Sequence, residues 1–228
     1  MKARSPASRA WIVLILLGLV LAAPVGIEQV SASSNGPNVA VVGDSITARY
    51  NNSAGSAKQG WWSIVGKHYG AKVTRYAQSG SGFQRPGHAC TGTIFSERLS
   101  ALKKQKPDVV FVEGGRNDWA YCKHHKLKQA SNARIKKGVD SFLARLKKSV
   151  PAGTTIYVLG PPWGPKDLDQ RERVTAIVKA SAKAHHMIYI STRGSFSKKR
   201  VVDGIHPNRA GSVKLGKKVI KAVGSKLG

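Results

Sequence analysis

The side chains that could carry out chemistry lie near opposite ends of the chain. Ser45 stands in Gly43-Asp44-Ser45, directly after a short apolar run, so its hydroxyl is expected where a strand ends in a turn. His206 follows Asp203 by three residues. Histidine ordinarily titrates close to neutral pH and suits a general base, and a carboxylate can fix the tautomer of its imidazole. The pattern predicts Ser45 as nucleophile, His206 as base and Asp203 as the group that orients it, although Asp44-Ser45 alone also fits an ordinary helix cap.

Two glycine-rich segments lie between these residues, at 78–82 (Gln-Ser-Gly-Ser-Gly) and 114–118 (Gly-Gly-Arg-Asn-Asp). The backbone N–H of Gly80 or Gly82 can approach a substrate closely, because glycine has no side chain. Asn117 adds an amide donor. Together they could hold the negative oxygen that forms when an ester carbonyl is attacked. Each segment is also consistent with a glycine-rich turn and nothing more.

Taken in order, these four segments resemble the four signature blocks of the SGNH/GDSL hydrolase family, and the match spans residues 42–208. The resemblance implies a flavodoxin-like α/β/α fold and hydrolysis of carboxylic esters through an acyl-enzyme on Ser45. It also implies an oxyanion hole made by the backbone N–H groups of Ser45 and Gly80, with Gly82 as second choice, and by the Asn117 side chain. The family typically needs no metal, and no cofactor is expected.

Hydrophobic patterning predicts the elements that must position these residues. Apolar or β-branched runs predict strands at 38–42, 71–77, 108–113, 154–159 and 187–190. Helical spacing of apolar residues predicts helices at 61–69, 94–105, 135–150, 168–184 and 208–223. Alternation of strands with helices predicts a three-layer α/β/α sandwich with about five parallel strands.

In such folds the site lies at the carboxyl ends of the strands. The segments that begin at Gly43, Gln78 and Gly114 each follow a predicted strand directly, so we expect them to meet at one edge. Trp119 and Trp163 also follow strand ends. They could line the substrate pocket, and packing in the core is an equally good interpretation.

The chain has two cysteines, Cys90 and Cys122, which in an exported protein predict a disulfide. The alternative is a metal site, because His88 flanks one cysteine and His124 and His125 flank the other, but this spacing is too tight for the common zinc motifs. A bridge would tie together the loops that supply the oxyanion donors, so we expect it to make that pocket more rigid. A purely stabilising role is equally consistent.

The first 32 residues predict a signal peptide: a basic start, an apolar run at 11–23 and the small residues Val30-Ser31-Ala32 at the cleavage position. The run is shorter than the roughly 20 residues that span a bilayer, although a retained anchor is the alternative. We therefore expect a secreted or envelope-associated protein, with the hydrolase domain at 33–228 and no transmembrane segment after cleavage.

Charge is the strongest compositional signal. The chain has 38 Lys and Arg against 11 Asp and Glu, a formal net charge of +27. Such a surface attracts polyanions, which suggests association with an anionic cell envelope, although solubility alone is an alternative. No nucleic-acid-binding motif is present.

These observations favour a secreted esterase that acts on small acyl or O-acetyl esters, including those of polysaccharides. Two alternatives stay open. One is a lipase or phospholipase that acts at anionic membranes, and the other is a polyanion- or envelope-binding protein with a vestigial hydrolase fold. Basic residues favour either alternative, whereas the intact set Ser45, Asn117, Asp203 and His206 argues against the second.

Overall fold

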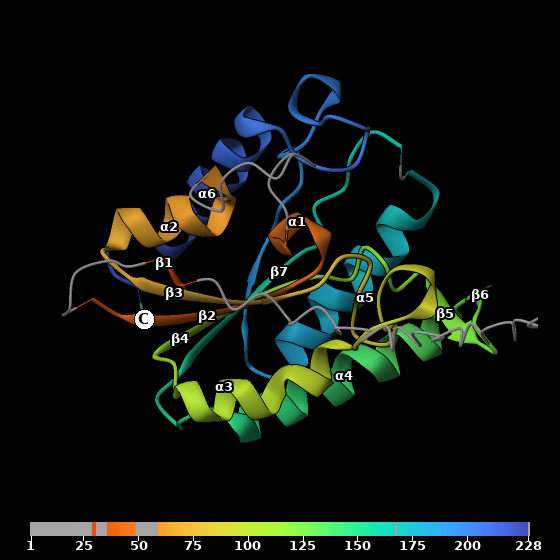
Figure 1. The fold of residues 1–228 in the computed structure, drawn as a ribbon, viewed down its shortest axis with the longest axis horizontal. Coiled ribbons are helices and arrows are strands. Elements are labelled where there is room, and N and C mark those ends of the chain that lie inside the picture. The colour runs from red at the N-terminus through yellow and green to blue at the C-terminus, as the bar shows by residue number, and fades with distance from the viewer. Residues whose placement is uncertain (1–28, 31–35, 49–58, 167, 228) are drawn as a thin grey trace, which may run out of the picture.

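A computed structural model describes residues 29–30, 36–48, 59–166 and 168–227, with one central sheet (Figure 1). Five strands of this sheet run parallel, as predicted, and a two-residue strand is added antiparallel at one edge. In spatial order they are β1 (Gln29–Val30), β3 (Lys72–Ala77), β2 (Asn38–Gly43), β4 (Val109–Glu113), β7 (Thr155–Leu159) and β8 (Ile188–Ile190).

Helices cover both faces of the sheet, which confirms the predicted three-layer α/β/α fold (Figure 1). One face carries α2 (Trp61–Tyr69) and α6 (Arg209–Val223). The other carries α3 (Leu99–Gln105), α4 (Asn132–Ser149) and α5 (Leu168–Ala184). The strands are buried on both faces, because alternate residues of β2 enter different cores: Ala40 and Val42 join the cluster under α4, while Val39 and Val41 join the cluster under α2.

The register of the sheet brings the candidate site together. Gly43 at the end of β2 is paired with Ala77 at the end of β3 on one side and with Glu113 at the end of β4 on the other. The segments that follow these three strands therefore begin side by side at one edge. The short helix α1 (Ser45–Ala48) lies at that edge, directly after β2.

Two features differ from the sequence prediction. The expected helix at 94–105 is a 3₁₀ turn at Phe95–Arg98 followed by α3, with the Glu97 carboxylate accepting the Ile94 N–H at 2.6 Å. A hairpin of β5 (Ala120–Lys123) and β6 (Lys126–Gln129) was not predicted.

The predicted signal segment lies outside the described residues except for Gln29–Val30, which pair with β3. Among the helices of the described ranges, none is long and apolar enough to cross a bilayer.

Candidate active site

Ser45, His206 and Asp203 form a continuous chain of hydrogen bonds. The Ser45 Oγ lies 2.9 Å from His206 Nε2, although the two residues are 161 positions apart. His206 Nδ1 lies 2.7 Å from Asp203 Oδ2. Because a carboxylate oxygen can only accept, Nδ1 carries the proton and Nε2 is left to accept the Ser45 proton. The structure thus brings together the three residues predicted for the hydrolytic site.

Asp203 is itself held in place by backbone donors. Its Oδ1 accepts the N–H of Ile205 at 2.9 Å and that of His206 at 2.8 Å, so the carboxylate turns back on its own loop. The loop is closed where Val202 N–H bonds to His206 C=O, and it leads into α6, whose first turn is capped by the Asn208 side chain. The ring of His206 is therefore fixed from both sides.

The Ser45 turn is fixed by short-range contacts. Asp44 Oδ1 accepts the Ile46 N–H at 2.9 Å, a local cap of the kind expected for this pair. A Cβ at position 43 would lie 2.4 Å from Thr47 Oγ1, so only glycine allows the turn to close this tightly. Ser45 itself is 8% exposed, with its hydroxyl facing His206.

The second segment distinguishes between the two predicted oxyanion glycines. Gly82 donates its N–H to the Arg85 carbonyl at 2.9 Å, which commits it to the loop interior. Gly80 lines the same cavity as Ser45 and has a positive φ of 74°. A Cβ there would lie 2.5 Å from His88 N, so both the conformation and the space require glycine. These contacts favour Gly80.

Asn117 joins all three strand ends. Its Nδ2 donates to Ser81 C=O at 2.9 Å and to Asp44 Oδ2 at 3.2 Å. The amide therefore lies between the Ser45 turn and the Gly80 loop, and it lines the cavity with both. Both hydrogens of the amide therefore have acceptors within the protein.

The cavity at Ser45 has a volume of about 540 Å³. It is lined by Ser45, Ser79, Gly80, Arg85, His88, Arg116, Asn117, Trp119, Ile205 and His206. Trp119 is thus in the wall, as predicted. Trp163 instead lines a neighbouring cavity of about 290 Å³, where its Nε1 donates to Thr175 Oγ1 on α5 at 2.9 Å.

The buried Arg98, which sequence reasoning missed, connects the first two segments. Its guanidinium donates to the Gly43 and Tyr76 carbonyls, at 2.9 and 3.1 Å, and to Ser81 Oγ at 2.7 Å. Burial lowers the pKa of Arg98 to about 10, so it remains charged at neutral pH. An arginine inside an expected helix gives no sequence signal of this role.

Three fully buried carboxyl groups lie behind the cavity, and burial raises the pKa of each. Asp44 and Glu113 are adjacent; burial is the main cause for both, and the nearby Asp44 charge raises the pKa of Glu113 further. Burial raises the pKa of Asp118 to about 6. Asp118 accepts the N–H groups of Phe83 and Gln84, at 3.2 and 2.9 Å, and so holds the loop after Gly82.

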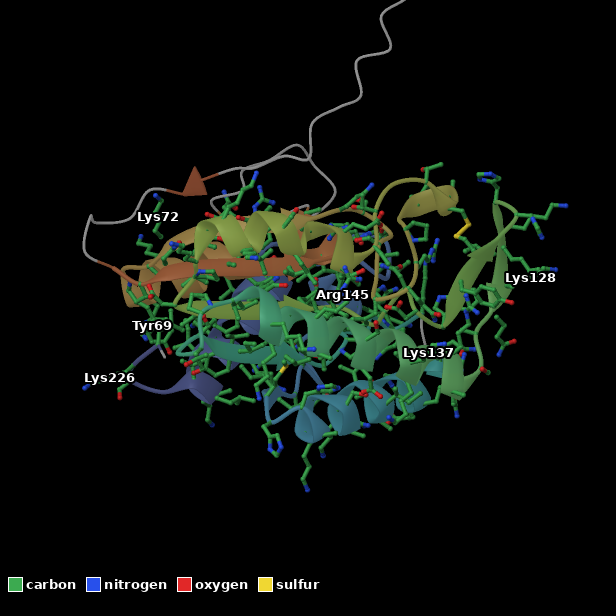
Figure 2. All side chains as sticks on the ribbon, turned by 90° about the horizontal axis from the view of Figure 1, so that it is seen from below. Tyr69, Lys72, Lys128, Lys137, Arg145 and Lys226 are labelled. Atoms are coloured by element: carbon green, nitrogen blue, oxygen red, sulfur yellow. A yellow bond between two sulfur atoms is a disulfide. The ribbon has the colours of Figure 1, made fainter. Side chains whose placement is uncertain are left out.

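Cys90 and Cys122 form the predicted disulfide, with their Cα atoms 5.6 Å apart. The disulfide joins the loop that carries Gly80 to β5, the first strand of the hairpin (Figure 2). That loop also bonds to itself where His88 N–H meets Ser79 C=O at 3.1 Å. Over the ranges that the structure covers, no group of three or more metal-binding side chains is found.

Comparisons with known proteins identify a family for this chain. The profile of the GDSL-like Lipase/Acylhydrolase family matches residues 41–213. A comparison with curated protein sequences found no match.

Several solved structures share the fold. Est24, a carbohydrate acetylesterase from Sinorhizobium meliloti, has a TM-score of 0.66 at 18% identity, over 82% of this chain and 98% of that chain. Axe2, an acetylxylan esterase from Geobacillus stearothermophilus, has a TM-score of 0.61 at 19% identity, over 84% and 95%. A family two carbohydrate esterase from Clostridium thermocellum has a TM-score of 0.61 at 17% identity, over 82% and 63%.

Proposed function

The chain belongs to the GDSL-like lipase/acylhydrolase family and is a carboxylic ester hydrolase, and we propose that it cleaves small acyl esters through an acyl-enzyme on Ser45. The observation that carries the proposal is the unbroken contact from Ser45 Oγ through His206 to Asp203. The proton on Ser45 Oγ and the proton on His206 Nδ1 thus each have an acceptor in place before substrate binds.

The proposed reaction has two halves. Ser45 Oγ attacks the ester carbonyl while its proton passes to His206 Nε2, and Asp203 stabilises the resulting imidazolium. His206 then gives this proton to the departing alkoxide, which leaves as the alcohol, and the acyl group remains on Ser45. A water molecule attacks the acyl-enzyme in the same way, with His206 again as base. The products are the carboxylic acid and free Ser45.

The negative oxygen of each tetrahedral intermediate would accept hydrogen bonds from the backbone N–H groups of Ser45 and Gly80 and from the Asn117 amide. Asn117 Nδ2 already makes a 2.9 Å bond to Ser81 and a longer one, 3.2 Å, to Asp44. We propose that the longer bond is exchanged for the oxyanion, while the bond to Ser81 keeps the amide in position.

The wall of the cavity supports a small acyl group. Among the described residues that line it, Trp119 and Ile205 are the only large apolar ones, and the others are polar, charged or glycine. A long acyl chain needs continuous apolar surface, which the described part of the wall does not offer, so the lipase alternative is less well supported. A carbohydrate acetylesterase and an acetylxylan esterase share the fold, which favours O-acetyl esters of carbohydrates as substrates.

We further propose that residues 1–32 are a cleaved signal peptide, that 33–228 form the exported hydrolase domain, and that the basic surface associates with an anionic cell envelope. The hairpin of β5 and β6 supports the last point. Its two strands expose Lys123, Lys126 and Lys128, and Figure 2 shows Lys128 at the end of the molecule that carries this hairpin. Retention on anionic polysaccharide that falls steeply with salt would mark this association as electrostatic.

The test of the proposed function is hydrolysis of 4-nitrophenyl esters from acetyl to palmitoyl by wild type and Ser45→Ala. We expect a preference for acetyl and a loss of roughly 10³-fold or more in kcat in the variant. Ser100→Ala, which truncates an exposed serine on α3, is the matched control and should keep full activity.

Full activity of Ser45→Ala would refute the serine mechanism, and a preference for palmitoyl would favour the lipase alternative. A folded wild type without activity on any ester would revive the envelope-binding alternative.

A further inference from the structure

Two buried arginines line the cavity that contains Ser45. Arg85 is 8% exposed and Arg116 is 5% exposed, and both contribute to the wall. A guanidinium carries five N–H donors and matches the two oxygens of a carboxylate or phosphate. Its presence in a catalytic cavity therefore bears on what the substrate carries besides its ester.

Backbone hydrogen bonds, rather than bonds to the guanidinium, hold Arg85 in place. Its carbonyl accepts the Gly82 N–H, and the two preceding residues are fixed by the Asp118 carboxylate. Its Nε is fully buried and meets no hydrogen-bond acceptor within the described ranges. A ligand cannot reach the buried Nε itself, but the guanidinium makes no hydrogen bond to any described residue, so its terminal NH₂ groups have capacity for an acceptor in the cavity.

Arg116, which directly precedes Asn117 in the chain, also lines the cavity. It follows β4, and its guanidinium lies over the Trp163 ring, 5.6 Å from the ring centroid. Stacking of this kind restrains the plane of the guanidinium. The role of Trp163 is thus to support Arg116 from the neighbouring cavity, which accounts for its position behind the wall.

The opposite charges near these arginines cannot reach a substrate. Asp44, Glu113 and Asp118 are 0% exposed, and none of them lines the cavity. Asp118 and Asp44 act on Arg85, and Arg116 acts on Asp44. Among the described residues that line the cavity, two are arginines and none is acidic, so the surface met by a ligand is cationic.

We propose that Arg85 and Arg116 form a subsite for an anionic group, a carboxylate or a phosphate, on the alcohol part of the ester. The inference rests on the proposed function, because a small acyl group has no room for the charge and the alcohol must then carry it. The substrate class is an O-acetyl ester of an acidic alcohol, such as an acidic sugar or a phosphorylated polyol.

The test compares two phenyl acetates of the same shape, 3-acetoxybenzoate and the neutral 3-acetoxybenzamide. A charge-assisted hydrogen bond is worth about 1.5–3 kcal/mol, so wild type should prefer the anionic ester by roughly tenfold to a hundredfold in kcat/KM. Arg85→Gln and Arg116→Gln should each reduce this ratio at least fivefold. The ratio is the readout because it cancels any general loss of activity. A third ester, 3-acetoxyphenyl phosphate, distinguishes phosphate from carboxylate as the preferred anion.

Arg145→Gln is the matched control, since it removes the same charge from an exposed position on α4 (Figure 2) that does not line the cavity. Arg145→Gln should leave the ratio of the two kcat/KM values unchanged. If it lowers this ratio as much as the cavity variants do, the preference for the anionic ester comes from the overall charge of the protein, and the proposal is overturned. If a cavity variant does not fold, inhibition of wild type decides: 3-hydroxybenzoate should compete with the neutral ester much better than 3-hydroxybenzamide.

A wild-type ratio near one, or a ratio that survives both cavity substitutions, would overturn the subsite. The proposed function fails separately, if Ser45→Ala hydrolyses both esters as wild type does.

Discussion

The buried pair of Asp44 and Glu113 predicts an unusual dependence of stability on pH. Glu113 Oε2 accepts from Thr47 Oγ1 at 2.8 Å and from the Asp44 N–H at 3.4 Å, while Oε1 meets no donor among the described residues. Two adjacent carboxyl groups without solvent cannot both ionise readily. Burial therefore raises the pKa of Glu113 well above its usual 4.5, and the protein takes up a proton on folding at pH values between 4.5 and the folded pKa.

The sign and size of the effect follow from this uptake. Because the folded pKa is raised, the contribution of Glu113 to stability is fully present below pH 4.5 and is lost as the pH rises towards the folded pKa. One proton changes the free energy of unfolding by at most about 1.36 kcal/mol per pH unit, so the loss by pH 7 has a ceiling of about 3.4 kcal/mol, from 1.36 × (7 − 4.5).

Glu113→Gln removes this titration while keeping the shape. The amide oxygen can accept from Thr47, and the NH₂ group can donate to Asp44 as a protonated glutamic acid would. We expect the variant to be more stable than wild type at pH 7, by up to about 3.4 kcal/mol, and the difference to shrink to under about 0.9 kcal/mol at pH 5.

The measurement is urea unfolding of both proteins at pH 5, 6, 7 and 8 at constant ionic strength. Glu172→Gln, at a side chain that is 61% exposed, is the control and should follow wild type with a small, constant offset. The opposite result is a free energy of unfolding of Glu113→Gln that stays at a constant offset from that of wild type between pH 5 and 8. Glu113 would then bind no extra proton in the folded state, and burial would not raise its pKa.

Two further predictions concern the candidate oxyanion hole. Asn117→Ala should lower kcat for acetyl esters by roughly 10²–10³-fold with little change in KM, since the amide would act on the transition state, and an equal rise in KM instead would indicate a role in ground-state binding. Replacing both Cys90 and Cys122 by serine should lower the free energy of unfolding by roughly 3–4 kcal/mol, because the bridge closes a loop of 32 residues. The variant should also have a lower kcat at a temperature where it stays folded. An unchanged kcat would mean that the bridge only stabilises the fold.

The parts of the fold that the sequence predicts are those with local signals. The run Asp108–Glu113 contains apolar residues that suit a strand buried on both faces, and β4 is found there. The apolar positions Ile135, Val139 and Phe142 repeat at helical spacing, and all three are buried on α4. Strand ends follow from glycines, and since parallel strands share an edge, the meeting of Ser45, Gly80 and Asn117 follows from topology alone.

The hairpin of β5 and β6 shows where local signals fail. Its two-residue turn places His124 and His125 at φ of 48° and 58°, a conformation that normally favours Gly, Asn or Asp. Its second strand is fully exposed and reads Lys-Leu-Lys-Gln, which has no strand preference of its own. Two contacts with other parts of the chain stabilise the hairpin. Cys122 is bonded to Cys90, and the Arg134 guanidinium of α4 lies 3.7 Å from the centroid of the Tyr121 ring.

The buried charges of the site are the other part that no local pattern reveals, and they explain how its loops stay in place. Arg98 joins two strand ends through the Gly43 and Tyr76 carbonyls, and Asp118 fixes the loop that carries Arg85. Each is stable in the interior only because the other loops supply its partners, so neither role exists until the whole edge has formed. A site built in this way is rigid before substrate arrives, which is what an oxyanion hole and a cationic subsite both require.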